Sequence, residues 1–169
     1  MEGRSVLTGQ LGCPVCGRTF ELTNGVLDLG DAPDWAENGD SLLDAAAIST
    51  LTGLHGPGGY LTLVGNVASI WQEVAELNPG VALVAVNPPL GIADQRISVL
   101  RAGRLPLKSG SMRGVVLGRT YGAKADWVSE AGRAVLPGLR VVGEGPDPSP
   151  AVIDLMASAD GVWVGTKRR

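Results

Sequence analysis

Short apolar runs alternate with amphipathic stretches from about Gly58 to Arg169. An apolar run bounded by turns predicts a buried strand, and apolar residues at three- and four-residue spacing predict a helix that packs on a sheet. The predicted strands are 60–64, 81–86, 97–100, 113–117, 139–142 and 162–164. The predicted helices are 67–77, 127–136 and 150–158. This alternation predicts an α/β fold with a short doubly wound, mostly parallel sheet and helices on both faces.

The predicted helices end at turn residues. The first ends near Asn78-Pro79-Gly80, and the second ends at Pro137-Gly138. The third helix places Val152, Ile153 and Met156 inward. Only one strand, 162–164, is predicted to close the sheet, and its unpaired edge could be covered in an oligomer.

The first 57 residues follow a different pattern. Residues 5–29 contain the Cys13–Arg18 segment CPVCGR and then TFEL, which is typical of a small β-hairpin. An acidic stretch, Asp31 to Asp44, leads into a helix at 42–51, with Ser41 and Asp44 as its capping box and Gly53 as its stop. We therefore divide the chain into a zinc-ribbon-like hairpin (1–30), an acidic segment with a helix (31–57) and an α/β domain (58–169).

Composition narrows the class of protein. Of 169 residues, 44% are hydrophobic and 18% are charged, as in globular domains. The formal net charge of −3 argues against nucleic acid as a partner. The single histidine, His55, argues against multi-histidine metal centres. Because no apolar run approaches the roughly 18 residues of a membrane span and no secretory signal begins the chain, we expect a cytoplasmic protein that does not contact membranes.

Three segments within 59–169 carry a resemblance. Residues 105–112 read LPLKSGSM, residues 130–140 read EAGRAVLPGLR, and residues 161–167 read GVWVGTK. Their order and spacing resemble the class I S-adenosylmethionine-dependent methyltransferases, where such segments precede the fourth strand, join a helix to the next strand, and form the last strand. The resemblance implies a Rossmann-like fold with a cofactor cleft outside the carboxyl ends of the strands.

The resemblance places the cofactor-binding positions at Gly65, Asn66, Asn87 and Arg101. The glycine-rich turn keeps one glycine, Gly65, followed by Asn66. The ribose-binding acid is replaced by Asn87, and the acid near the adenine by Arg101. The acid that opens the fourth strand is replaced by Arg113.

These departures predict weak or absent binding of S-adenosylmethionine. A carboxylate accepts two hydrogen bonds from a diol, whereas an asparagine offers one acceptor and two donors. A buried hydroxyl left unpaired costs about 1–3 kcal/mol. We therefore predict no catalytic residue and a degenerate methyltransferase-like protein, a pseudoenzyme that serves as a scaffold, regulatory or assembly subunit with a protein partner or as a homo-oligomer. The first alternative is an active S-adenosylmethionine-dependent small-molecule methyltransferase with an altered cofactor site.

Cys13 and Cys16 resemble one knuckle of a zinc ribbon. A structural zinc site needs four ligands, and the chain has no second cysteine pair. A dimer sharing one zinc, or His55 with a carboxylate, would complete the site. A knuckle without metal, packed as a hairpin, is the other interpretation. The second alternative function is therefore a zinc-dependent protein-interaction module, in which Trp35 serves as a lid or interface residue.

All charged residues between Gln95 and Ala125 are basic: Arg96, Arg101, Arg104, Lys108, Arg113, Arg119 and Lys124. This run could dock an acidic partner, an anionic ligand or RNA. Solvation, or pairing with the acidic stretch 31–44, is the favoured interpretation. Trp71, Trp127 and Trp163 fall on apolar faces, so we predict that they pack in the core.

Overall fold

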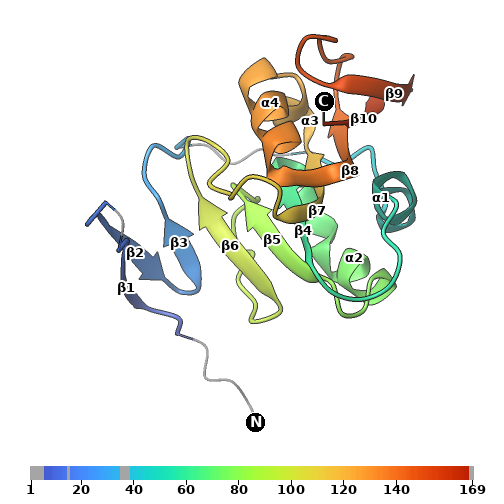
Figure 1. The fold of residues 1–169 in the computed structure, drawn as a ribbon. Coiled ribbons are helices and arrows are strands. Elements are labelled where there is room, and N and C mark those ends of the chain that lie inside the picture. Colours follow the sequence, from blue (N-terminus) through green and yellow to red (C-terminus); the bar gives the residue numbers. More distant parts are fainter. Residues whose placement is uncertain (1–5, 15, 35–38, 168–169) are drawn as a thin grey trace.

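The computed structural model describes residues 6–14, 16–34 and 39–167. Within them a single sheet is built from ten strands (Figure 1), in the order β1-β2-β3-β6-β5-β4-β7-β8-β10-β9. The strands are β1 (Gly9–Gly12), β2 (Thr19–Thr23), β3 (Val26–Asp28), β4 (Tyr60–Val64), β5 (Ala82–Val86), β6 (Ile97–Arg101), β7 (Met112–Leu117), β8 (Val135–Glu144), β9 (Asp154–Ala159) and β10 (Val162–Thr166). The helices are α1 (Ala45–Thr52), the 3-10 helix η1 (Gly65–Ile70), α2 (Trp71–Leu77), α3 (Arg119–Gly122) and α4 (Ala125–Ala134).

The middle of the sheet is parallel and both margins are antiparallel. Six strands, in the order β3-β6-β5-β4-β7-β8, run parallel to one another. At the margins, β2 pairs antiparallel with β1 and β3, and β10 pairs antiparallel with β8 and β9. The predicted α/β class with a mostly parallel sheet is confirmed, with more strands than the pattern indicated. The N-terminal strands continue the sheet, because β3 pairs with β6 from Val26 opposite Val99.

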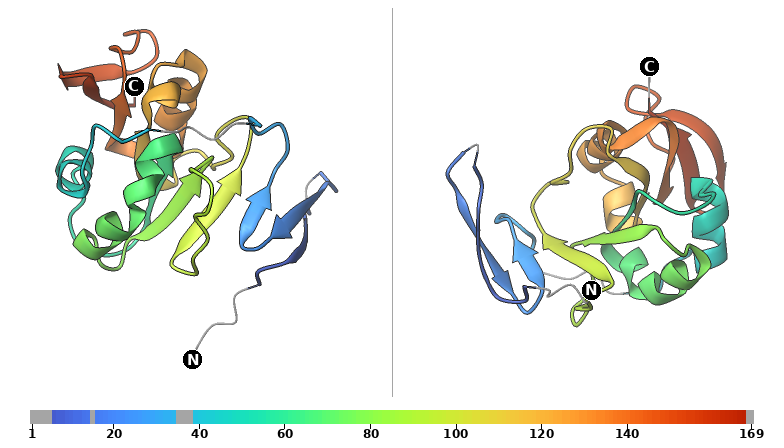
Figure 2. Two further views of the ribbon diagram at one scale, coloured as in Figure 1. Left: turned by 180° about the vertical axis from the view of Figure 1, so that it is seen from behind. Right: turned by 60° about the horizontal axis from the view of Figure 1, so that its bottom comes forward.

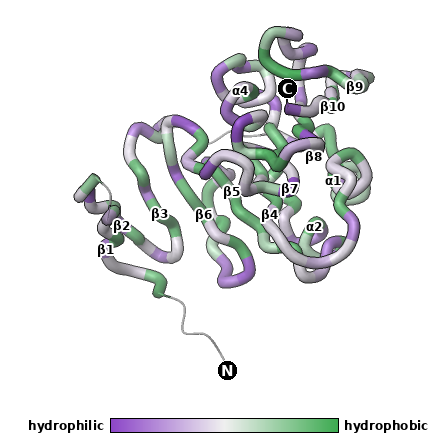
Figure 3. Tube along the Cα trace, viewed as in Figure 1, coloured by the Kyte–Doolittle hydropathy of each residue, from purple (hydrophilic) through white to green (hydrophobic). Residues whose placement is uncertain are grey.

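Two hydrophobic cores lie on the two faces of the sheet. Val116 faces the first core, where it packs with Ile48 of α1 and Val74 of α2. Val115 faces the second core, where it packs with Trp127 of α4. Figure 2 shows helices on both sides of the central strands, and Figure 3 shows hydrophobic residues along those strands. The predicted covering of both faces by helices is therefore confirmed.

Most predicted elements appear close to their expected bounds. The helix predicted at 67–77 begins as η1 and continues as α2, and Gly53 ends α1 in the left-handed conformation, at a φ of 68°. Trp71, Trp127 and Trp163 are buried, as expected. Trp35 lies outside the described residues. No helix of the described residues is long and apolar enough to cross a membrane.

The prediction of a helix at 150–158 is wrong. Residues 154–159 form β9, which pairs with β10 and supplies the hydrogen bonds that the edge of β10 needs. Asp160 and Gly161 join the two strands with φ values of 52° and 77°, which is the backbone of a tight hairpin turn. Ile153 is buried, but Met156 is exposed on the strand. The sheet therefore closes with a hairpin where the sequence had indicated one strand.

Two helix ends also differ from the prediction. Asp44 is the N-cap of α1, because its carboxylate accepts a hydrogen bond from the Ala47 amide at 2.7 Å. Ser41 does not cap this helix, since its hydroxyl contacts Glu144 instead. The second difference is the end of the helix predicted at 127–136: α4 ends at Ala134, and Val135 already belongs to β8.

Gly143 of β8 offers a test of the packing. A β-carbon at this position would overlap the indole of Trp163, which is fully buried. We predict that Gly143→Ala lowers the free energy of unfolding by about 1–3 kcal/mol, because a packed core does not accept added volume. Gly132→Ala is the matched control: the added β-carbon meets no atom within 4 Å. It should raise the free energy of unfolding by about 0.5–1 kcal/mol, because alanine favours a helix. Urea denaturation measures both; equal stability of Gly143→Ala and wild type would contradict this packing.

Candidate functional site

The residues predicted to bind a cofactor lie at one edge of the sheet. Gly65 and Asn66 follow β4, Asn87 follows β5, and Arg101 ends β6. Because β4, β5 and β6 are parallel, their carboxyl ends meet at the same edge. The structure therefore brings these residues to one side of the molecule, at the upper edge of the central strands in Figure 1.

The side chain of Asn87 is held by the backbone of Ala102, the residue that follows β6. Its side-chain Nδ2 donates to the Ala102 carbonyl at 2.8 Å, and its Oδ1 accepts from the Ala102 amide at 2.9 Å. The residue is 6% exposed and adopts a left-handed backbone, at a φ of 49°. Both ends of the amide are thus used within the protein. In this arrangement Asn87 cannot replace a carboxylate that accepts two hydroxyls.

Arg101 and Arg113, which stand where the methyltransferases have acidic residues, form hydrogen bonds with different segments. Arg101 is half-buried, and its Nη2 donates to the Pro33 carbonyl at 2.9 Å. Arg113 donates to four backbone carbonyls of residues 55–58, with the shortest distance, 2.7 Å, to His55 and Gly58. Arg113 therefore anchors the loop before β4. Only Arg101 takes part in the edge where the other site residues lie.

The turn after β4 is covered by the chain itself. Gly65 has a φ of 76°, and Gly65, Asn66, Val67 and Ala68 are all buried. The Asn66 Nδ2 lies 3.3 Å from the Asp40 carbonyl and 3.4 Å from Glu144 Oε2. The segment before α1 thus packs on the turn whose glycines would approach a ligand in the methyltransferases that the sequence resembles.

Glu144 is the residue that the sequence analysis missed. It ends β8 and has no exposed surface. Its Oε1 accepts from the Leu42 amide at 2.8 Å, from the Leu43 amide at 3.3 Å and from the Ser41 hydroxyl. A buried carboxylate is stable only when such donors satisfy it. The available signal is an acid two positions after the predicted strand 139–142.

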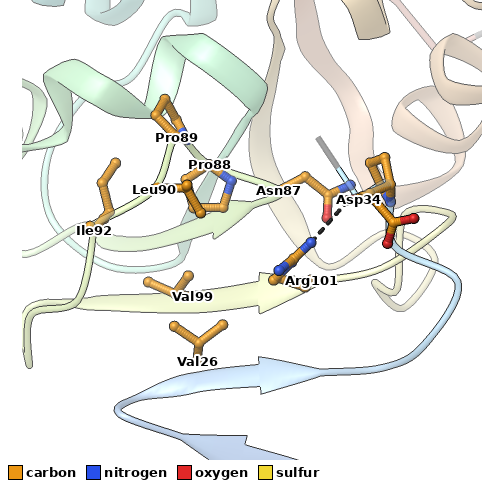
Figure 4. Close-up of a pocket in the computed structure, with 11 residues that line it drawn as sticks. Val26, Asp34, Asn87, Pro88, Pro89, Leu90, Ile92, Val99 and Arg101 are labelled. Atoms are coloured by element: carbon orange, nitrogen blue, oxygen red, sulfur yellow. Dashed lines mark hydrogen bonds between the residues drawn. The ribbon is translucent and has the colours of Figure 1, made fainter. Parts of the chain in front are cut away.

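A cleft opens beside Asn87. It has a volume of about 110 Å³ and extends from the end of β5 over the faces of β6 and β3. Figure 4 shows it beneath the loop that follows β5, with Asp34 and Arg101 at its rim. Its lining residues are Val26, Pro33, Asp34, Asn87, Pro88, Pro89, Leu90, Gly91, Ile92, Val99 and Arg101. Residues 87–96, which connect β5 to β6, form the loop above the cleft and contain no helix.

The cleft has the elements of a site for one ring system. Pro88, Pro89 and Ile92 offer apolar walls, and Asp34 offers an exposed carboxylate at the rim. Sites for drug-sized ligands measure roughly 300–1,000 Å³, so this cleft suits part of such a ligand.

The cysteine knuckle lies in the β1–β2 connection. Cys13 is half-buried and Cys16 is exposed, and the Gly17 amide donates to the Cys13 carbonyl at 2.9 Å. Among the described residues, no group of three or more histidine, cysteine or acidic residues could hold a metal. Zinc bound by Cys13 and Cys16 therefore stays a prediction.

The basic run does not pair with the acidic stretch through ion pairs in the described part of the chain. Arg96 pairs with Asp94 at 3.1 Å, and Arg133, outside the run, pairs with Glu130 at 2.7 Å. The hydrogen bond from the Arg96 side chain lowers the pKa of Asp94. The Arg96 guanidinium also lies 4.9 Å from the centre of the Trp71 ring. Arg101 reaches the acidic stretch only through the carbonyl of Pro33.

Comparison with solved structures relates the fold to methyltransferases. The pyocyanin biosynthetic protein PhzM superposes with a TM-score of 0.53 and 15% identity, over 73% of this chain and 54% of PhzM. A geranyl diphosphate C-methyltransferase from Streptomyces coelicolor A3(2) gives a TM-score of 0.50 and 17% identity, over 64% of this chain and 47% of the enzyme. A putative antibiotic-biosynthesis methyltransferase from Anabaena variabilis ATCC 29413 gives 0.47 and 18%, over 59% and 43%.

These similarities show a shared fold. The chain spans about half the length of the solved structures that it matches. No protein-family model matches the sequence. No curated protein sequence matches it either. The methyltransferase-like, Rossmann-like fold that the sequence predicted is therefore supported at the level of architecture.

Glu144 generates a prediction about stability. Glu144→Ala removes the acceptor of the Leu42 amide and one of the two acceptors of the Leu43 amide, whose other acceptor is the Ser41 hydroxyl at 3.0 Å. We expect the substitution to lower the free energy of unfolding by about 2–4 kcal/mol. Glu21→Ala, which removes an exposed acid on β2, is the control and should change it by less than about 0.5 kcal/mol. Hydrogen exchange adds a local readout, since the Leu42 and Leu43 amides should exchange faster in the Glu144 variant. Unchanged exchange at both amides would contradict the contacts described here.

Proposed function

We propose that the cleft beside Asn87 holds the adenosine part of an S-adenosylmethionine-type cofactor, and that the protein is a small-molecule methyltransferase with an altered cofactor site. The observation that carries this proposal is the cleft itself, at the carboxyl end of β5 in a methyltransferase fold. Such a cofactor, when bound, supplies a methyl group carried on a positively charged sulfur.

The altered site moves the acidic group from the end of β5 to the segment that joins β3 to α1. We call this the crossing segment; the structure describes its residues 29–34 and 39–44. Asn87 is occupied by Ala102, so its amide is fixed as part of the wall. Asp34 lines the same cleft and is exposed, which leaves its carboxylate able to accept hydrogen bonds from the hydroxyls of a ribose. Arg101 supports this arrangement because its bond to Pro33 holds the residue before Asp34.

The comparison with solved structures favours this catalytic interpretation over the non-catalytic one that the sequence had favoured. The geranyl diphosphate C-methyltransferase of similar fold was solved with Mg²⁺, geranyl-S-thiolodiphosphate and S-adenosyl-L-homocysteine. Its sequence is only 17% identical, so it supports the class of ligand and not the acceptor.

A non-catalytic scaffold, regulatory or assembly subunit is the second candidate. It is favoured by the covering of the turn after β4, where Gly65 and Asn66 are buried beneath a segment that Glu144 holds. In methyltransferases that turn approaches the methionine part of the cofactor. A protein that keeps the turn closed retains the fold as a platform for a partner or a second copy.

Zinc-dependent association is a separate proposal. Two chains, each contributing Cys13 and Cys16, would supply the four thiolates of a structural zinc site. Metal analysis of freshly purified protein tests it together with the oligomeric state: one zinc for each dimer supports it, and a zinc-free protein contradicts it.

Calorimetric titration with S-adenosylhomocysteine tests the cofactor proposal. The expected result is a dissociation constant near 1 μM, about −8 kcal/mol. Asp34→Asn should weaken binding roughly tenfold, because one strong acceptor becomes a weaker one. Asp126→Asn, an exposed acid on α4, is the control and should leave the affinity unchanged.

The outcomes separate the two candidates. Binding that depends on Asp34 supports a cofactor site, and methyl transfer to a small acceptor would then complete the assignment. Binding that Asp34→Asn does not alter contradicts the role of Asp34. No heat at millimolar ligand contradicts the cofactor proposal and supports the non-catalytic subunit.

A further inference from the structure

A second cavity lies on the other side of the crossing segment. It has a volume of about 530 Å³ and is formed where β2, the end of β3 and the loop after β6 meet. Its lining residues are Arg18, Phe20, Leu29, Gly30, Asp31, Ala102, Gly103, Arg104 and Pro106. This volume is within the range of roughly 300–1,000 Å³ that is typical of small-molecule sites.

Backbone contact separates this cavity from the cleft beside Asn87. The Gly103 amide donates to the Gly30 carbonyl at 3.3 Å. A β-carbon on Gly103 would overlap the Asp31 carbonyl oxygen, so only glycine permits the two segments to pass at this distance. The wall between the cavities is therefore made of packed main chain, and each cavity is a site in its own right.

Positive charge predominates in the cavity. Arg18 and Arg104 are both exposed, and neither forms an ion pair with any residue that the structure describes. Asp31 is the one acidic residue among the lining residues. In a chain with a formal net charge of −3, two arginines without acidic partners in one cavity favour an anion there. Guanidinium groups bind carboxylates and phosphates through paired, charge-assisted hydrogen bonds.

The floor of the cavity is apolar. Phe20, Leu29 and Pro106 are each half-buried and line it together with the two arginines. The Arg18 guanidinium lies 5.9 Å from the centre of the Phe20 ring. An aromatic ring and a proline offer flat surfaces on which a ligand ring can pack. All helices of the described structure lie over the other strands, so no helix covers this part of the sheet (Figures 1 and 2).

We infer that this cavity binds a small aromatic anion, an aryl phosphate or aryl carboxylate, whose oxyanion pairs with Arg18 and Arg104 and whose ring packs on Phe20. The site is separate from the proposed cofactor cleft and does not depend on it. The inference assigns a role to Arg104 of the basic run and to Arg18 beside the cysteine knuckle. The proposed methyltransferase activity uses neither arginine.

Titration of the isotopically labelled protein with phenyl phosphate tests the inference, with the backbone amide resonances as readout. We expect saturable shifts at Ala102, Gly103 and Arg104, with submillimolar affinity. Arg18→Ala and Arg104→Ala should each weaken binding about tenfold, which is about 1.4 kcal/mol. Arg119→Ala removes an exposed arginine of α3 and is the matched control, with no expected change. Inorganic phosphate and phenol, tested alone, should each bind at least about tenfold more weakly.

Any one of four results would overturn the inference. Three of them are the absence of saturation at 10 mM phenyl phosphate, roughly the upper limit of weak specific binding, equal affinity for inorganic phosphate, and unaltered affinity in both arginine variants. The fourth is a set of shifts confined to the amides of Asn87 and Leu90, which would place the ligand in the other cleft and contradict a separate site. Benzoate in place of phenyl phosphate distinguishes an aryl carboxylate from an aryl phosphate as the preferred ligand. Failure here leaves the titration with S-adenosylhomocysteine unaffected, since the two experiments use different ligands and substitute residues of different cavities.

Discussion

The buried carboxylate of Glu144 determines how the N-terminal part of the chain crosses the sheet. A charge without solvent contact requires hydrogen-bond donors, and the donors here come from residues 41–43 and from Asn66. The segment before α1 must therefore lie over the turn that follows β4. The same segment, further toward the N-terminus, places Pro33 against Arg101 and Asp34 at the rim of the cleft. The glycine turn, the cleft and the second cavity all have this crossing segment as a common wall.

One edge of the sheet consequently combines a closed part and an open part. Glu144 and Asn66 close the turn after β4, and Asn87 is closed by its paired bonds to Ala102. The cleft beneath residues 87–96 and the cavity between Arg18 and Arg104 remain open. The closed part favours a protein that does not bind a cofactor as methyltransferases of this fold do. The open part offers a carboxylate, apolar walls and guanidinium groups, which are sufficient to bind small ligands by other contacts.

The sequence was sufficient to predict elements that are buried on both faces. The runs 60–64 and 113–117 are apolar because their strands lie between two cores, and parallel pairing then brought Asn87 and Arg101 to one edge. It was insufficient for β9, whose residues are all exposed and carry no burial contrast, although Asp160-Gly161 is a hairpin signal. The partners of the site residues were also unpredictable. Leu42 and Glu144 are 102 positions apart, and local pattern contains no information on such a contact.

The most direct test of this account is a crystal structure of the protein with S-adenosylhomocysteine bound. The account predicts the adenosine between Pro88 and Ile92, the ribose hydroxyls within hydrogen-bond distance of Asp34, and Asn87 still paired with Ala102. A ribose bound to Asn87, with the Ala102 bonds broken, would contradict the proposed transfer of the acidic group to the crossing segment. A crystal grown at saturating ligand with the cleft unfilled would contradict the cofactor site itself.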